Sequence, residues 1–320
     1  MATLITGGSG FIGAEVVRTL LNMGKKNVVI FDVDPSTKRL DDVANQVELI
    51  RGDVGNFSHV LSIVKSLRPT AIYHLGGMLS LASDLDPPGA IHSNVLGTSH
   101  ILEAARLFDV SQVLYSSTIG TYGLDIRERI ISDYTLQRPE FFYGATKVFC
   151  EHMGLFYRRK YGLDFRGVRY PSVVGPGVKT PGVVQFTSWV IEESAYGKTY
   201  TVYVKPETRC PIIYFKDAAR AIIELGEAPI EDIRMVNYLV AGVTPVASAE
   251  ELVEMVKEKI STAQIDFKPD LEIQKILDKL SYPIDDRVAK EEWNWKPKYN
   301  QEKLIDDFLE EIKTHPTRYL

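Results

Sequence analysis

A glycine-rich segment near the start of the chain limits the possible folds most strongly. Thr6-Gly-Gly-Ser-Gly-Phe-Ile-Gly13 follows the apolar run Ala2–Ile5. Apolar residues then return at the spacing of one helix face, at Phe11, Ile12, Val16, Val17, Leu20 and Leu21. A glycine turn between a strand and a helix lets the backbone approach a pyrophosphate, and the helix N-terminus offers unpaired N–H groups to its charge. The sequence therefore predicts a dinucleotide site formed by Gly7, Ser9, Gly10, Phe11, Ile12 and Gly13.

A carboxylate follows the second apolar run of the chain. Val28–Phe31 ends at Asp32, nineteen residues beyond Gly13. A carboxylate at this place can accept hydrogen bonds from both adenosine ribose hydroxyls and repels a 2′-phosphate, so NAD is expected rather than NADP. The alternative is a glycine turn that only packs a strand against a helix, and the strand, helix and acid together disfavour it.

Charge and cysteine content exclude several classes of function. The 320 residues carry a net charge of −5 without a basic run, which favours a small-molecule partner over nucleic acid. The two cysteines and six histidines show no metal-ligand spacing, so neither a metal site nor a disulfide is expected. No apolar stretch approaches the ~20 residues of a membrane helix. The first strand is expected from residue 2, which leaves no room for a targeting segment. A cytoplasmic protein without membrane contact is therefore predicted.

The order of apolar and amphipathic segments predicts the fold class. Strand-like runs at Val47–Ile50, Ala71–Leu75, Val113–Ser116 and Phe165–Tyr170 alternate with amphipathic segments, as in βαβ units. We therefore expect an α/β protein with a Rossmann-type, doubly wound parallel sheet. The alternation ends near residue 175, and later segments resemble helices at 186–195, 249–259 and 301–313 and strands at 200–204 and 212–214.

This change of pattern predicts two lobes. Residues 1–175, with 215–241 returning to them, are expected to form the NAD-binding domain. Residues 176–214 and 242–320 are expected to form a smaller C-terminal lobe that caps the substrate. Such a lobe would close over the carboxyl edge of the sheet, where open α/β sheets bind their ligands.

A tyrosine and a lysine four residues apart are the candidate catalytic pair. Tyr143 and Lys147 would lie one turn apart on one helix face. The ammonium, with the positive nicotinamide ring, would lower the pKa of the phenol, and Tyr143 could then take the proton of a substrate alcohol. Thr118, at the end of a strand-like run, could orient the substrate oxygen, although such hydroxyls also serve as helix caps. Tyr299 and Lys303 have the same spacing but lie outside the alternating pattern.

Together these motifs resemble the extended short-chain dehydrogenase/reductase family. The resemblance rests on the glycine turn, Gly52-Asp-Val54, His74-Leu-Gly-Gly77, Asn94-Val-Leu-Gly-Thr98, Ser116-Ser-Thr118 and Tyr143-X-X-X-Lys147. It implies NAD as cofactor and a homodimer formed through two helices, near 91–108 and 143–161. It also implies further cofactor contacts at Asp53, Val54, Leu75, Gly76, Gly77, Asn94, Lys147 and Tyr170, and substrate contacts at Ser80, Thr118, Tyr143 and Gly182.

Several stretches resemble the threonine-dehydrogenase branch of this family, among them Gly77–Ser80, Gln137–Pro139 and Arg169–Pro171. The resemblance implies oxidation of a secondary alcohol on a small hydroxylated substrate. Val183-Val184 stand where that branch generally has two threonines, which favours a less polar substrate. Two alternatives are a nucleotide-sugar epimerase or dehydratase that keeps its NAD bound, and a cofactor-binding protein without catalysis.

Overall fold

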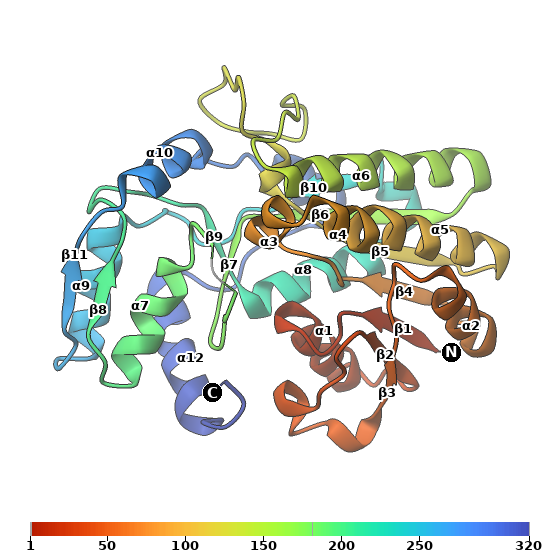
Figure 1. Ribbon diagram of the computed structural model, residues 1–320, viewed down its shortest axis with the longest axis horizontal. Coiled ribbons are helices and arrows are strands. Elements are labelled where there is room, and N and C mark those ends of the chain that lie inside the picture. The colour runs from red at the N-terminus through yellow and green to blue at the C-terminus, as the bar shows by residue number, and fades with distance from the viewer. Residues whose placement is uncertain (1, 181, 320) are drawn as a thin grey trace.

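A seven-stranded parallel sheet forms the larger lobe of the computed structural model, which describes residues 2–180 and 182–319 (Figure 1). The strand order is β10-β6-β5-β4-β1-β2-β3. From β1 the chain proceeds outward through β2 and β3, then returns to the other side of β1 for the remaining strands. The strands are β1 (Thr3–Thr6), β2 (Val28–Asp32), β3 (Val47–Arg51), β4 (Ala71–His74), β5 (Gln112–Thr118), β6 (Asp164–Tyr170) and β10 (Asn237–Leu239). This arrangement confirms the predicted Rossmann-type, doubly wound sheet.

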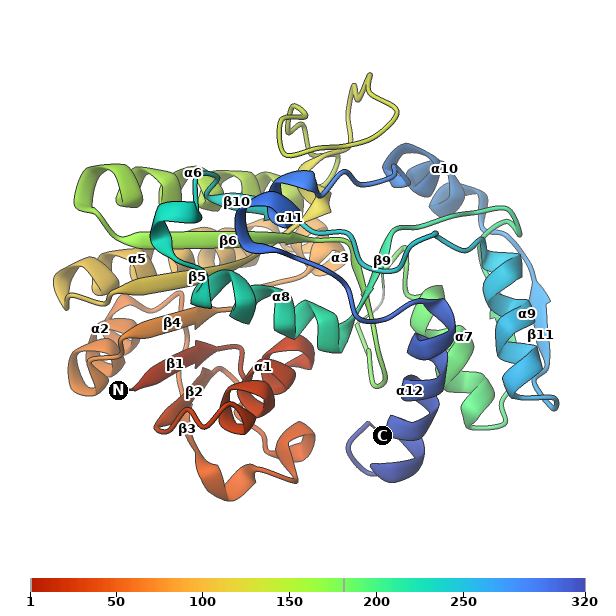
Figure 2. The ribbon, with the colours of Figure 1, turned by 180° about the vertical axis from the view of Figure 1, so that it is seen from behind.

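Helices cover both faces of this sheet, so its strands are apolar on both sides (Figures 1 and 2). In β2, Val28 and Ile30 join the core under α1 (Phe11–Asn22) and α8 (Phe215–Glu227), whereas Val29 and Phe31 join the opposite core. The opposite core lies under α2 (Phe57–Leu67), α5 (Gly97–Leu107) and α6 (Phe142–Tyr161). Alternation of side chains along one strand thus feeds two separate cores.

A smaller lobe with its own core lies beside the carboxyl edge of the sheet (Figure 1). Its helices and strands are α7 (Phe186–Ala195), α9 (Ala249–Lys259), α10 (Leu271–Leu280), α12 (Gln301–Thr314), β7 (Ser172–Val174) paired with β9 (Ile212–Tyr214), and β8 (Tyr200–Val202) paired with β11 (Ile265–Phe267). The expected helices at 186–195 and 249–259 have these bounds. The expected strand at 200–204 ends two residues earlier, and the last helix extends one residue further.

One segment expected in the smaller lobe packs against the sheet instead. The side chains of α11 (Arg287–Trp293) and of Trp295 belong to the core under α1 and α8. The indole Nε1 of Trp295 donates a hydrogen bond to the carbonyl oxygen of Ala241 at 2.9 Å. A large indole buries more apolar surface in this core than it could at the edge of the smaller lobe. The expected ranges also include residues 1, 181 and 320, which lie outside the described part of the chain.

The remaining helical segments are short. They are α3 (Ser80–Leu85), α4 (Pro87–Ala90), the π-helical turn η3 (Ile91–Leu96), and the 3₁₀ turns η1 (Lys38–Leu40), η2 (Ala44–Gln46), η4 (Ile119–Thr121) and η5 (Ile230–Asp232). The helix expected over 91–108 is thus a π-helical turn continued by α5. Among the helices described, none combines the length and the apolar character that a bilayer crossing requires.

Candidate active site

The glycine turn after β1 is built by close backbone contacts. Gly7 has a φ of +70°, and a Cβ added there would lie 2.7 Å from the Cα of Gly76. A Cβ on Gly13 would lie 2.1 Å from the carbonyl oxygen of Gly7. A side chain at Gly7 would push the glycine turn and the turn after β4 apart, and one at Gly13 would push α1 away from the glycine turn. The two turns therefore form one continuous floor of bare backbone.

The start of α1 and the end of β2 suit the two ends of an adenosine diphosphate. Gly10 precedes α1, and no side chain caps this helix. The N–H groups of its first turn can therefore bind a pyrophosphate. Asp32 ends β2, and its carboxylate accepts hydrogen bonds from the backbone N–H groups of Ser9 and Asp34, both at 3.2 Å. The bare turn, the uncapped helix and the carboxylate fit NAD.

Three of the expected cofactor contacts, Asp53, Val54 and Leu75, lie just beyond the ends of β3 and β4. The carboxylate of Asp53 accepts a hydrogen bond from Gly55 N–H at 2.8 Å and lies 2.8 Å from His92 Nε2. Val54 is buried against α5, and Leu75 is half-buried, with its N–H bonded to the carbonyl of Thr6. These contacts fix the backbone of both turns relative to the glycine floor.

Asn94 joins the turn after β4 to the helix that carries the candidate catalytic pair. It lies in η3, and its amide bonds both the N–H and the carbonyl of Met78, at 2.7 and 3.1 Å. Its Nδ2 also donates to Thr146 Oγ1 on α6 at 3.1 Å. A Cβ added to Gly77 would lie 2.8 Å from Asn94 Oδ1 and 3.9 Å from Lys147 Nζ. Lys147 therefore lies directly beside the backbone floor.

Tyr143, Lys147 and Thr118 meet at the carboxyl end of β5. The Nζ of Lys147 donates a hydrogen bond to the carbonyl oxygen of Ser116 at 2.8 Å and lies 5.6 Å from the centre of the Tyr143 ring. Thr118 Oγ1 accepts a hydrogen bond from Gly120 N–H at 3.0 Å, so its own O–H remains a donor. A Cβ on Gly120 would lie 3.4 Å from Thr118 Oγ1 and 3.9 Å from Tyr143 Cδ1. The cap and the positioning roles of Thr118 are therefore compatible.

Burial dominates the electrostatics of Tyr143 and Lys147, the candidate catalytic pair. It raises the pKa of the Tyr143 phenol above its usual value and lowers the pKa of Lys147 to about 8. The lowering of the Tyr143 pKa by Lys147, which the sequence predicts, does not outweigh burial in the polypeptide by itself. Additional positive charge at this place, as the oxidised nicotinamide carries, is needed to favour the phenolate.

A buried charge network under the site has no simple sequence signature. The carboxylate of Glu151 on α6 accepts hydrogen bonds from Ser117 Oγ at 2.5 Å and from Arg169 at 2.7 Å. Arg169 also lies 3.3 Å from Asp133, whose carboxylate accepts from the N–H of Leu239 at 2.7 Å. Burial raises the pKa of Asp133 to about 6. The network ties α6 to three strands of the sheet.

Four other residues named from the sequence lie at different depths. His74 ends β4 and is buried between Thr6 Oγ1 and Thr98 Oγ1, and burial lowers its pKa to about 3. The Tyr170 hydroxyl donates to the carbonyl of Ala218 within the core, so a cofactor contact there would need its backbone. Ser80 begins α3 and makes no side-chain hydrogen bond among the described residues, while the carbonyl of Gly182 accepts from Tyr203 in the smaller lobe.

The parallel sheet, the bare glycine floor and the adjoining Tyr–Lys pair define an NAD-dependent enzyme of the extended short-chain dehydrogenase/reductase class. Residues 3–240 match the NAD-dependent epimerase/dehydratase family, and the chain belongs to that family.

Individual relatives cover almost the whole chain. The mitochondrial L-threonine 3-dehydrogenase of Bos taurus is 29% identical over 308 residues, which are 96% of this chain and 81% of the relative. The solved structure of L-threonine dehydrogenase from Clostridium difficile aligns with a TM-score of 0.88 at 29% identity and covers 98% of both chains. The holo form of the GalE-like L-threonine dehydrogenase from Cupriavidus necator aligns with a TM-score of 0.86 at 27% identity, over 97% of this chain and 99% of that one.

Proposed function

We propose that the protein oxidises the secondary alcohol of a small, threonine-like substrate and releases NADH. One observation carries the proposal: Lys147 lies between the backbone floor at Gly77 and the ring of Tyr143. This position places a cation and a phenol beside the bare backbone that fits the cofactor. The relatives named as L-threonine dehydrogenases support the choice of substrate class.

Each residue of the site has a separate task in the proposed reaction. When bound, NAD accepts a hydride from the carbon that bears the hydroxyl. Tyr143 takes the hydroxyl proton as general base, and Lys147 favours its phenolate form and holds the nicotinamide ribose. The free O–H of Thr118 donates to the substrate oxygen and fixes its direction toward Tyr143. The same groups run the reverse reduction.

The smaller lobe is proposed to cap the substrate. We assign to it residues 176–214 and 242–320 except 287–295, whose side chains pack with the sheet. Val183 and Val184 lie half-buried against the core of this lobe, next to Gly182. Two valines offer methyl contacts and no hydrogen bonds, so the proposed substrate is less polar at this end than threonine. Ser80 and Gly182 are proposed to contact its other groups.

Release of NADH from a substrate panel tests the proposal. L-threonine and 3-hydroxy acids of increasing apolar character are each incubated with the protein and NAD, and near-ultraviolet absorbance is followed. The expected result is net NADH formation, strongest for a substrate less polar than threonine. Conversion of a UDP- or dTDP-sugar without net NADH would instead indicate an epimerase or dehydratase. No turnover of any compound, with Tyr143→Phe indistinguishable from wild type, would indicate a protein without catalysis.

A homodimer through α5 and α6 is proposed as the assembled form. Phe149 and Phe156 on α6 are 55% and 53% exposed, and Leu96 and Leu107 beside α5 are exposed as well. Such a cluster of large apolar side chains on neighbouring helices is typical of a protein interface. Light scattering after size exclusion is expected to give a dimer, and Phe156→Glu a monomer. Leu271→Glu, at an exposed leucine on α10, is the matched control that keeps the dimer.

The cytoplasm is the proposed compartment. Cys150 and Cys210 are both buried and unpaired, as reducing surroundings permit. Cell fractionation tests this proposal: recovery with cytoplasmic markers is expected, and recovery from an organelle or an exported fraction would contradict it.

A further inference from the structure

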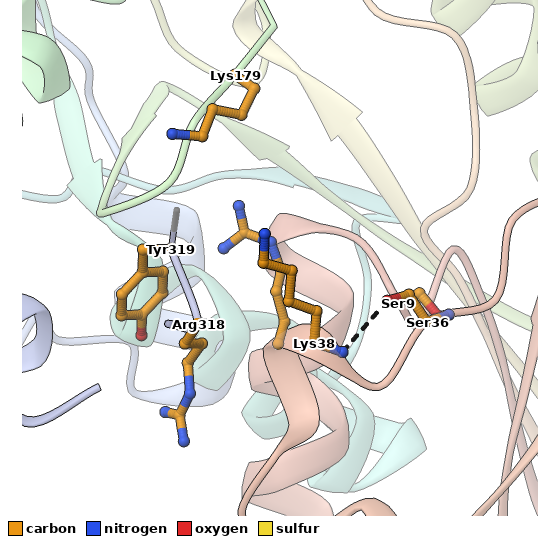
Figure 3. A pocket seen from close by; sticks show the side chains of 7 residues that line it. Ser9, Ser36, Lys38, Lys179, Arg318 and Tyr319 are labelled. Atoms are coloured by element: carbon orange, nitrogen blue, oxygen red, sulfur yellow. Dashed lines mark hydrogen bonds between the residues drawn. The ribbon is translucent and has the colours of Figure 1, made fainter. Parts of the chain in front are cut away.

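A basic pocket lies next to the adenosine end of the cofactor groove, between the two lobes (Figure 3). Ser9 and Ser36 line it, and the hydroxyl of Ser9 accepts a hydrogen bond from Ser36 N–H at 2.9 Å. Ser9 also bonds Asp32 through its N–H, so the pocket begins where the ribose carboxylate ends. The volume is about 220 Å³, several times the ~30 Å³ share of one water in the liquid.

Three distant segments of the chain supply its cations. The turn after β2 contributes Lys38 and Arg39, the loop before α7 contributes Lys179, and the C-terminal tail contributes Arg318 beside Tyr319. In Figure 3, the side chain of Lys38 extends toward the loop that carries Lys179. None of the described residues that line the pocket carries a carboxylate.

Arg39 shows that this charge is not fully balanced by the protein. Its guanidinium donates to the carbonyl oxygens of Pro176 and Gly177, and it forms no ion pair with a described residue. Burial lowers the pKa of Arg39, and the nearby Tyr319 and Glu192 offset this effect only in part. By contrast, Arg318 turns away from the pocket and pairs with Asp41, with 2.7 Å between Nε and Oδ1. Among the described residues, Arg318 thus has a carboxylate partner and Arg39 has none.

Lys179 has only one weak partner. Its Nζ lies 3.4 Å from the carboxylate of Glu192, which also accepts a hydrogen bond from the N–H of Gly177 at 3.0 Å. The Lys179 side chain is 64% exposed, so such a pair contributes little and leaves the ammonium able to reach a second anion.

We propose that this pocket binds a phosphate group. A phosphate would accept hydrogen bonds from the guanidinium of Arg39, the ammonium groups of Lys38 and Lys179, and the serine hydroxyls. Because Lys179 belongs to the smaller lobe and Arg39 to the larger, the bound phosphate would hold the two lobes together over the cofactor. This phosphate is separate from the phosphates of the cofactor, which belong to the glycine turn and the start of α1.

Calorimetry in phosphate-free buffer at constant ionic strength tests the proposal. Inorganic phosphate is titrated into the wild-type protein, and NAD is titrated with and without phosphate. Lys179→Glu is the test variant, because its exposed side chain can change without loss of the fold. Lys268→Glu, at another exposed lysine of the smaller lobe, changes the net charge equally and is the control. Since the readout is binding, it stands whatever alcohol the enzyme oxidises.

Saturable phosphate binding that Lys179→Glu weakens about tenfold or more, with Lys268→Glu unchanged, supports the proposal. If phosphate then strengthens NAD binding, the pocket holds free phosphate. If phosphate competes with NAD, or if only NAD binding responds to Lys179→Glu, the pocket is part of the cofactor site already described and the proposal is wrong. The proposal is wrong if neither phosphate nor NAD affinity distinguishes Lys179→Glu from Lys268→Glu.

Discussion

At the scale of single residues, the proposed role of Lys147 and its position make opposing electrostatic demands. The proposed catalysis needs its positive charge beside Tyr143 and the nicotinamide ribose, whereas its buried position disfavours that charge. The hydrogen bond to Ser116 and the contact with the Tyr115 ring, 4.7 Å from Nζ to the ring centre, compensate only in part. A charged Lys147 at this position therefore lowers the stability of the fold.

Lys147→Met should make this cost measurable in the cofactor-free protein. The folded-state pKa of about 8 lies below the usual lysine pKa of 10.5, and this difference corresponds to roughly 3 kcal/mol. This destabilisation is complete below pH 8 and disappears as the pH rises toward 10.5, because the folded protein releases its proton first. Urea unfolding at pH 7 and near pH 10 is expected to show stability rising with pH in wild type relative to Lys147→Met. Parallel pH dependences of the two proteins would show that the charge carries no such cost.

Thr118 is expected to act through its hydroxyl. Thr118→Val keeps the shape and removes both the acceptor for Gly120 N–H and the donor for the substrate, so kcat should fall about 10- to 100-fold. Thr118→Ser keeps both bonds and should retain most of the activity. Steady-state kinetics of the two variants measure the difference. Equal losses in both would mean that the methyl group, not the hydroxyl, matters.

At the scale of elements, α6 carries the proposed catalytic pair, and hydrogen bonds hold this helix on two sides. Asn94 in η3 bonds Thr146 on one side, and Glu151 bonds Ser117 and Arg169 underneath. The sequence predicted the helix and the Tyr–Lys face from a four-residue spacing. It could not predict the network, because these two partners of Glu151 lie 18 and 34 residues away along the chain and reach it only through the sheet.

Glu151→Ala should reveal how firmly α6 is held. Removal of one partner from a buried pair leaves Arg169 uncompensated, and a loss of about 3–5 kcal/mol in the free energy of unfolding is expected. Glu254→Ala, at an exposed position on α9, is the control and should change stability by less than about 0.5 kcal/mol. Chemical denaturation measures both. A small loss in Glu151→Ala would mean that other contacts hold the helix.

At the scale of the whole molecule, the two lobes share more structure than their sequence order suggests. The glycine turn, the strand runs and the return of α8 and β10 to the sheet followed from apolar periodicity. The position of Trp293 and Trp295 did not follow from it. Their segment comes after the smaller lobe in the sequence, yet both indoles pack in the core under α1 and α8. Likewise, the π-helical turn at Asn94 reads as ordinary helix in the sequence.

Because the Trp295 segment links the lobes, they should unfold together. Scanning calorimetry of the wild-type protein is expected to show one transition. Trp295→Ala opens a large cavity and removes the bond to Ala241, so a loss of roughly 3–5 kcal/mol is expected. Two separate transitions in wild type would contradict a shared core.

The most direct test of the account is Tyr143→Phe, which removes only the proposed base. With the best substrate of the panel, kcat should fall at least about 100-fold, because no other group takes the alcohol proton. NAD affinity, measured by calorimetry, should stay within a few fold of wild type. An unchanged kcat with intact NAD binding would contradict the assignment of Tyr143 as the base.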